Sequence, residues 1–122
     1  SFRDLGLASE RTKADALAAC DVFCLPSSHE SFGIAYVEAW FYRKPVICGT
    51  APACRELVDN GKSGLWADQD PANLAEKIMR LYRDPELARS MGQFGHSLQQ
   101  ERFSWQVVAN SHLHAAGLQP KA

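Results

Sequence analysis

The sequence predicts a parallel α/β fold that ends in a run of helices. Two short apolar runs, residues 21–26 and 44–49, are uncharged in their centres, and each is followed by a segment of helical composition. Runs of this kind are typical of strands buried on both faces, as in parallel sheets. A third short run, 63–67, precedes segments with helical periodicity alone. This order indicates a parallel sheet with flanking helices and a helical C-terminal tail.

The N-terminal elements come from composition and spacing. "SFRDLGLAS" predicts a short strand that ends at Gly6. A helix is expected over about 10–19, with Ala14, Leu17 and Ala18 on one face. The strand "DVFCLP" follows and is closed by proline.

The middle of the chain predicts two further helices. The first runs from Gly33 to about 42, with Ile34, Val37 and Phe41 at i, i+3 and i+7 facing inward. After the strand "KPVICG", "ACRELVDNG" predicts a short helix stopped by its final Asn-Gly pair.

Two aspartate–proline pairs, Asp70-Pro71 and Asp84-Pro85, mark the starts of the next helices, since each supplies an N-cap and a proline at the first helical position. A last helix is expected from Ser104 to about His114. The side chains expected to face inward are Leu74, Ile78, Leu81, Leu87, Met91, Phe94 and Leu98.

Composition describes an ordinary globular domain. The 122 residues are 46% hydrophobic and 22% charged, and the net charge of -1 gives no reason to expect nucleic acid as a partner. No apolar run reaches the roughly 20 residues that span a bilayer, and no signal peptide is recognised, so a cytoplasmic protein is expected. The chain opens on Ser, and its sheet is thin. We therefore expect a piece of a longer protein, truncated at its N-terminus.

The four cysteines predict neither a disulfide framework nor a metal site. The spacing of Cys20 and Cys24 is not that of structural zinc, and no histidine stands at a ligand-like offset. Cys24 and Cys48 lie in apolar runs and are expected inside the sheet. His112 and His114 fall on different faces of a helix, so a shared metal is not expected.

The stretch "SSHESFGIAYVEAW" is the candidate binding site. Ligands of open parallel sheets bind outside the carboxyl ends of the strands, and this stretch follows such an end. The first N–H groups of the helix, around residues 32–34, together with the helix dipole, favour a phosphate. Gly33 lets an anion approach the backbone closely.

Two glutamates flank this expected phosphate site. Glu30 lies just before the helix and Glu38 lies about 7–8 Å along it, and carboxylates accept strong hydrogen bonds from hydroxyls. A nucleotide sugar, with hydroxyls on both sides of a diphosphate, suits this layout. The spacing alone is explained equally well if Glu30 is only a helix-entry residue and Glu38 only lies on a solvated helix face. The apolar neighbours of Glu38 in "VEAWFY" argue against a solvated face.

A histidine and three tryptophans are further candidates for roles near the site or in the core. His29 adjoins Glu30 and is a candidate contact for a sugar hydroxyl or phosphate, with loop packing as the alternative. The three tryptophans are expected in the core or at a domain contact: Trp40, Trp66 and Trp105.

Beyond these residues, "ESFGIAYVEA" resembles the E-x7-E motif of retaining glycosyltransferases of the GT-B fold, especially family 4, the glycosyl transferases group 1. The resemblance extends through "ACDVFCLPSSHESFGIAYVEAWFYRKPVICGT", "RELVDNGKSGL" and the closing "RFSWQVVA", and covers about Leu5 to Ala109. It implies a Rossmann-like parallel sheet, with residues 1–122 as the nucleotide-sugar-binding domain of a two-domain enzyme.

The resemblance also implies residue roles. Glu30 would contact donor-sugar hydroxyls and stabilise positive charge near the anomeric carbon. Glu38 would accept the ribose hydroxyls, and Leu7 and Ala8 would pack against the base. No metal or other cofactor is expected, since protein groups neutralise the leaving diphosphate. Four residues would offer backbone N–H groups to the sugar and diphosphate: Ser31, Phe32, Gly33 and Ile34.

Two departures from the family pattern limit this transfer of roles. Pro52-Ala53 replaces a frequent Gly-Gly pair, so contacts from that loop change because proline has no N–H. Glu56 matches the family's acidic position and is expected to support the loop. The family's basic pair for the diphosphate falls upstream of this chain, and Arg43 and Lys44 follow the helix at its far end.

The expected function is donor binding in a hexosyltransferase. The acceptor, a sugar or lipid, would bind the missing N-terminal domain, and the full-length protein would be cytoplasmic, with peripheral membrane contact left open. Alone, this piece is expected to bind donor weakly and transfer nothing. The alternatives are a GT-B epimerase acting on a nucleotide sugar and a non-catalytic nucleotide-sugar-binding module. A flavodoxin-like signalling domain is a weaker alternative, because nothing in it requires both glutamates at these positions.

Overall fold

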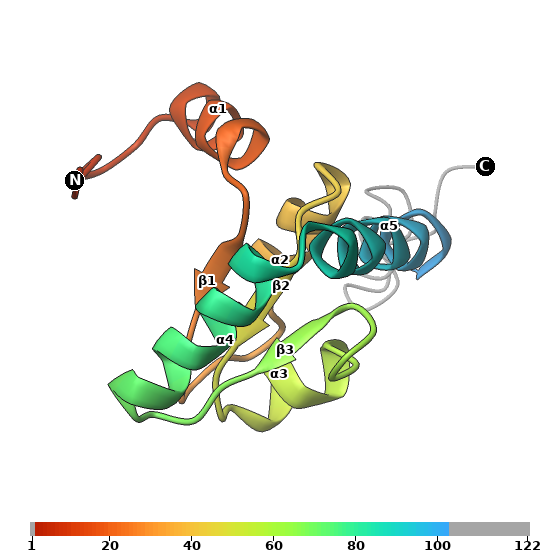
Figure 1. The fold of residues 1–122 in the computed structure, drawn as a ribbon. Helices are drawn as coiled ribbons and strands as arrows, with labels where there is room; N and C mark the ends of the chain where they lie inside the picture. Colours follow the sequence, from red (N-terminus) through yellow and green to blue (C-terminus); the bar gives the residue numbers. More distant parts are fainter. Residues whose placement is uncertain (1, 103–122) are drawn as a thin grey trace.

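The computed structural model describes residues 2–102, and its centre is a three-stranded parallel sheet (Figure 1). The strands β1 (Phe23–Leu25), β2 (Val46–Cys48) and β3 (Gly64–Trp66) are neighbours in chain order. Phe23 lies opposite Val46, and Val46 lies opposite Gly64. The predicted parallel α/β arrangement is confirmed.

Five helices alternate with or follow these strands. Their bounds are α1 Glu10–Ala19, α2 Ile34–Phe41, α3 Pro52–Leu57, α4 Pro71–Arg83 and α5 Pro85–Arg102. Asp70 caps α4 by accepting the N–H of Ala72, and Asp84 accepts the N–H of Leu87 at the start of α5. Both predicted aspartate–proline starts are therefore confirmed. The helix expected from Ser104, together with Trp105, His112 and His114, lies outside the described residues.

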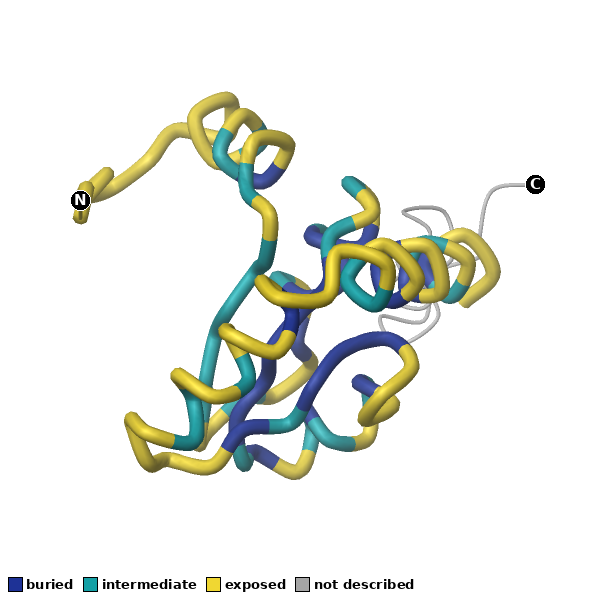
Figure 2. The backbone as a smooth tube through the Cα atoms, viewed as in Figure 1, coloured by how far each residue is buried: buried dark blue, intermediate teal, exposed yellow. Residues whose placement is uncertain are grey.

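The alternation of side chains along β2 divides the core into two layers. Val46 and Cys48 face Tyr36 and Trp40 of α2, whereas Ile47 faces the other side. There it packs with Leu65, Ala67, Leu81 and Met91, under α4 and the first part of α5. Figure 2 shows β2 and β3 as the buried centre, while α1 is mostly exposed.

Helix α5 continues beyond the sheet and packs across α2. A Cβ on Gly92 would collide with the carbonyl of Arg43, and one on Gly95 would collide with the ring of Trp40. The Trp40 indole N–H donates to the carbonyl of Ser63 at 3.1 Å. The two glycines therefore allow the close approach of the helices that buries Trp40 completely. The expectation that Trp40 is a core residue is confirmed.

The strand predicted to end at Gly6 is absent. Residues 2–8 have no regular structure, and their apolar side chains, including Phe2 and Leu7, are exposed. A strand is stable only when its backbone groups pair with a neighbour, and β1 pairs with β2 alone. For the same reason β1, predicted to be buried on both faces, is only half-buried, and so is Cys24.

The inward face predicted for the second helix is confirmed at Val37 and wrong at Ile34 and Phe41. Ile34 and Phe41 are exposed, and Val37 shares the buried face with Tyr36, Ala39 and Trp40. The sheet and α5 cover the side of α2 that carries Tyr36 and Trp40, so the buried face is turned away from the line through Ile34 and Phe41. Three other residues expected inward are exposed: Ala18, Ile78 and Phe94.

The reasons for these three exposures are local. Ala18 lies on α1, which touches the body mainly through Leu17, and Ile78 lies beside the open edge of β1. On α5 the buried stripe runs through Met91, Gly95 and Gln99, and Phe94 lies beside this stripe and is exposed. Within residues 2–102, every helix is too short or too polar to cross a membrane.

Candidate functional site

The carboxyl ends of the three strands meet at one edge of the sheet, and the loops that follow them are tied together there. The Ala51 N–H donates to the carbonyl of Ser27 at 3.1 Å. The side-chain amide of Gln69 donates to the carbonyl of Pro26 at 2.9 Å. A Cβ on Gly49 would collide with the backbone at Ser27, so glycine permits this contact. The first two residues after β1 are therefore fixed.

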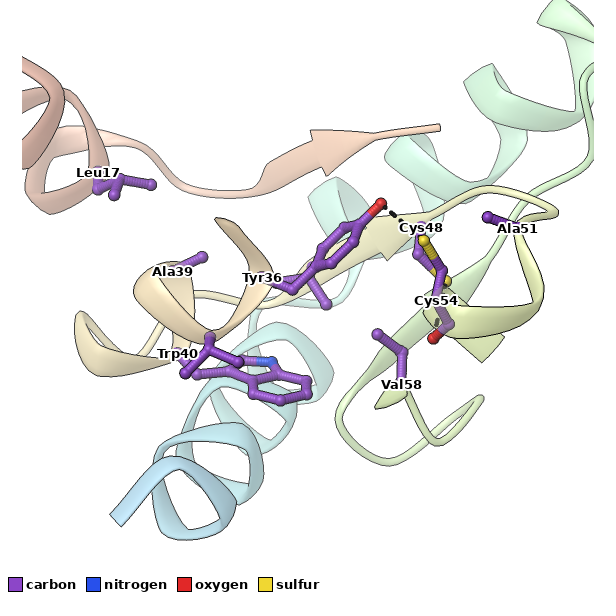
Figure 3. Packing of buried hydrophobic residues seen from close by; sticks show 10 residues of the cluster. Leu17, Tyr36, Ala39, Trp40, Cys48, Ala51, Cys54 and Val58 are labelled. Atoms are coloured by element: carbon purple, nitrogen blue, oxygen red, sulfur yellow. Dashed lines mark hydrogen bonds between the residues drawn. The ribbon is translucent and has the colours of Figure 1, made fainter. Parts of the chain in front are cut away.

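A buried polar cluster holds the end of β1 from below (Figure 3). The Tyr36 hydroxyl donates to the carbonyl of Leu25, and the Cys54 thiol contacts the Tyr36 oxygen at 3.4 Å. Burial raises the pKa of Tyr36 above its ordinary value and raises the pKa of Cys48 to about 12. These groups stay protonated at neutral pH, so α2 remains anchored to β1 by a hydroxyl donor. The four cysteines are free thiols.

The guanidinium group of Arg55 contacts the loops that follow β2 and β3. This role of Arg55 was not predicted. Its Nε donates to the carbonyl of Gly49 at 3.2 Å, and its Nη2 lies 3.5 Å from Oδ1 of Asp68. Its Cζ lies over the Trp66 ring, 5.0 Å from the ring centroid. One side chain thus connects the loops after β2 and β3. No local pattern in the sequence predicts this role, because the partners of Arg55 lie on separate loops.

The Pro52-Ala53 departure lies at the start of α3. Pro52 is the first residue of the helix, where a backbone N–H has no helical partner in any case. The proline therefore costs α3 nothing. Glu56 lies on the same helix with an exposed side chain.

In contrast, the second part of the loop after β1 faces solvent. His29 and Ser31 are exposed, and Glu30 is half-buried. The Ser28 hydroxyl and the His29 Nδ1 lie 3.0 Å apart. Phe32 is 44% exposed, which is high for a phenylalanine. The loop predicted to receive a ligand is therefore accessible.

Gly33 begins α2 in the left-handed conformation, with φ at 82°. A Cβ here would lie 2.9 Å from Cδ2 of Leu57, so a side chain at this position would also require Leu57 to shift. The first backbone bond of the helix runs from the Tyr36 N–H to the Gly33 carbonyl at 3.1 Å. The N–H groups of Ile34 and Ala35 precede this bond, as an anion site requires. Gly33 is explained by conformation and packing, a reason different from the predicted approach of an anion.

Glu38 is not on a solvated face. Only 17% of its side chain is exposed, and its Oε2 lies 3.2 Å from Nζ of Lys13 on α1. Lys13 also lies 3.1 Å from Oε2 of Glu10. Hydrogen bonds to Glu10 and then to Glu38 raise the pKa of Lys13. Lys13 was not predicted; the Glu10–Lys13 spacing indicates a helical pair, but nothing in the sequence connects Lys13 to a residue 25 positions away.

A pocket of about 160 Å³ opens beside Glu38, between α1 and α2. Its lining combines apolar side chains with the charged groups of Lys13, Glu10 and Glu38. Glu30 and residues 31–34 do not line it, so the two glutamates are not brought into one pocket. The lining residues are Glu10, Lys13, Ala14, Leu17, Glu38, Phe41 and Tyr42.

Leu7 and Ala8 lie at the N-terminal end of α1. Both are exposed, and they directly precede Ser9, whose hydroxyl caps α1 by accepting the Thr12 N–H at 3.1 Å. Arg43 and Lys44 lie past the far end of α2, as predicted. Within residues 2–102, no three His, Cys, Asp or Glu side chains are grouped as metal ligands would be.

Comparison with protein families gives a match over most of the chain. The model of the family described as glycosyl transferases group 1 matches residues 5–97. The D-inositol 3-phosphate glycosyltransferase of Corynebacterium jeikeium is 36% identical over 94 residues, which are 76% of this chain and 22% of that protein. The human alpha-1,3/1,6-mannosyltransferase ALG2 is 31% identical over 96 residues, which are 79% of this chain and 23% of that protein.

Comparison with solved structures gives matches over most of the chain as well. The Anabaena protein Alr3699/HepE in complex with UDP and glucose superimposes with a TM-score of 0.80 and 27% identity, over 93% of this chain and 30% of that one. The chain thus spans less than a third of the length of each of these proteins. The Rossmann-like sheet is that of these GT-B relatives.

Proposed function

This chain belongs to the glycosyl transferases group 1 family, and from that premise we propose that it is the donor-binding part of a retaining glycosyltransferase. The enzyme moves a hexose from a nucleoside diphosphate sugar to a sugar or lipid acceptor. The observation that carries the proposal is the accessible start of α2, at the carboxyl end of β1, with a carboxylate on either side.

The diphosphate binds at the start of α2. The N–H groups of Ile34 and Ala35 precede the first helical bond, and the positive end of the helix dipole lies there. Ser31, Phe32 and Gly33 supply further backbone contacts. The tied loops fix Pro26 and Ser27, from which the chain runs to this site, and the Tyr36 N–H bond to the Gly33 carbonyl fixes the first turn of the helix.

Glu30 is assigned to the donor sugar. Its half-buried carboxylate lies on the accessible loop, just before the helix. There it accepts sugar hydroxyls and stabilises the positive charge that develops near the anomeric carbon, with His29 beside it as a second polar contact.

Glu38 is assigned to the ribose, and Leu7 and Ala8 to the base. Glu38 lies one helical turn beyond Ile34, on the side of α2 that faces α1, and the Leu7–Ala8 segment precedes α1. The ligand therefore runs from the start of α2 toward the junction of the two helices. Transfer proceeds without a metal, since backbone N–H groups compensate the diphosphate.

The acceptor binds a second domain of the longer protein, which closes over this one. The protein is proposed to be cytoplasmic, and its acceptor decides whether it works at a membrane surface. UDP-sugars are the first donors to test, because the Anabaena neighbour is described with UDP and with UDP-glucose.

The test is calorimetric titration of the full-length protein with UDP, GDP and ADP, and with their hexose conjugates. One nucleoside diphosphate should bind. Glu30→Gln should weaken the matching nucleotide sugar about tenfold and leave the diphosphate unchanged, because Glu30 contacts only the sugar. Glu38→Gln should weaken both.

Glu76→Gln, which changes an exposed carboxylate on α4, is the matched control and should alter neither affinity. If Glu30→Gln binds the nucleotide sugar as tightly as the wild type, the role of Glu30 is wrong. If no nucleotide binds the wild type, the proposed function is wrong. The anomeric configuration of the product, read by NMR, decides between retention and inversion, and conversion of the donor without acceptor would identify an epimerase.

A further inference from the structure

The ion pair between α1 and α2 is the feature that the proposed function leaves unexplained. Lys13 and Glu38 belong to different helices, and their charged atoms lie 3.2 Å apart. The lysine side chain is 44% exposed, whereas Glu38 is mostly covered. An exposed ion pair contributes little to stability, so we look for a role of this pair in positioning the groups around it.

Helix α1 is attached to the body by few groups. It stands away from the sheet in Figure 1, and Leu17 is its one buried residue. Lys13 lies one turn before Leu17 and so on the same face of the helix. The Lys13–Glu38 pair is therefore a second point of attachment, next to the Leu17 anchor.

We infer that Lys13 is a positioning residue for the nucleoside end of the donor site. This inference rests on the proposed function. Lys13 contacts Oε2 of Glu38 and so leaves Oε1 available to accept a ribose hydroxyl. Through α1 it also fixes the segment that carries Leu7 and Ala8, immediately before the cap at Ser9.

Glu10 also pairs with Lys13, at 3.1 Å, but this pair does not connect the two helices. Glu10 lies on the same helix as Lys13, and its side chain is 91% exposed. Loss of Glu10 should therefore matter much less than loss of Lys13.

The experiment compares five variants of the full-length protein by calorimetric titration with whichever of UDP, GDP and ADP binds the wild type most tightly. Lys13→Met keeps the apolar stem and removes the charge, and it should raise the dissociation constant about fivefold. Lys13→Arg should restore affinity to within about twofold, and Glu10→Gln should stay within about twofold.

The double variant Lys13→Met with Glu38→Gln tests whether Lys13 acts through Glu38. In the Glu38→Gln background, Lys13→Met should have little further effect. An equal loss in both backgrounds would mean that Lys13 acts independently of Glu38. Unchanged binding by Lys13→Met would mean that Lys13 plays no part in binding, and tighter binding would mean that it competes with the ligand. Each of these results overturns the inference. Failure of the wild type to bind any nucleotide would instead refute the proposed function.

Discussion

Two parts of the loop after β1 differ in how they are held. Pro26 and Ser27 are fixed by contacts from the next two loops, and Leu25 is fixed by Tyr36 below. Residues 28–32 face solvent around the half-buried Glu30. The chain is therefore held in place as far as Ser27, and the segment where the ligand is proposed to bind begins directly after it. Binding residues on loops that a rigid scaffold positions are a common arrangement in enzymes.

The largest expected effect on stability comes from truncating Trp40, a fully buried side chain of the rigid core. Trp40→Ala deletes a fully buried indole and its bond to the Ser63 carbonyl, and should lower the free energy of unfolding by about 3–5 kcal/mol. Tyr82→Ala, at a 76% exposed position, should change it by less than about 0.5 kcal/mol. Urea unfolding measures both, and similar losses for the two would contradict the assigned core.

Gly33 lies between the solvent-facing residues 28–32 and the partly buried helix α2. Gly33→Ala should destabilise the fold by about 2–3 kcal/mol, because it adds a left-handed alanine and a clash with Leu57. Gly61→Ala is the matched control: φ there is 90°, but nothing lies within 4 Å of an added Cβ, so only about 1 kcal/mol should be lost. Chemical denaturation measures both. Equal costs would show that packing at Gly33 is unimportant.

A smaller effect is expected at the hydroxyl that anchors β1. Tyr36→Phe leaves the Leu25 carbonyl and the Cys54 thiol without this partner and should cost about 1–2 kcal/mol. Tyr82→Phe, which alters an exposed hydroxyl, should be neutral. A neutral Tyr36→Phe would mean that the anchor does not depend on the hydrogen bond.

The smallest effect at ordinary pH concerns the raised pKa values of Cys48 and Tyr36. Both groups are neutral in the fold, and their pKa values are lower in the unfolded chain. The stability they contribute is therefore complete below about pH 9 and is lost as pH rises toward about 12. Urea midpoints measured between pH 7 and 10.5 should fall above pH 9, and Cys48→Ala should reduce the slope. A flat profile would contradict the burial of these groups.

Much of the rigid part could be predicted from sequence. The runs around Val46 and Leu65 are apolar throughout, and the aspartate–proline pairs at 70–71 and 84–85 are local signals, so the strands and helix starts were found. The strand before Gly6 was predicted wrongly, because its local pattern carries no information about whether a neighbouring strand is present. The inward face of α2 was predicted correctly at Val37 and wrongly at Ile34 and Phe41, because α5, distant in sequence, covers the side of α2 that carries Trp40.

The candidate site divides in the same way. The loop with Glu30 and the start of α2 at Gly33 follow from one continuous stretch, and the structure places them as that stretch predicts. Lys13 and Arg55 were not found, because each connects segments that only the tertiary fold brings together. Their roles depend on distances that no spacing in the sequence reveals.

The central claim is that a diphosphate binds the backbone at the start of α2 while Glu38 accepts the ribose. A crystal structure of the full-length protein with its nucleoside diphosphate tests this most directly. We predict a phosphate oxygen about 3 Å from the backbone nitrogen of Ile34 or Ala35, and a ribose hydroxyl at hydrogen-bond distance from Glu38. A diphosphate bound elsewhere, with the Glu38 carboxylate still engaged by Lys13 alone, would contradict the account.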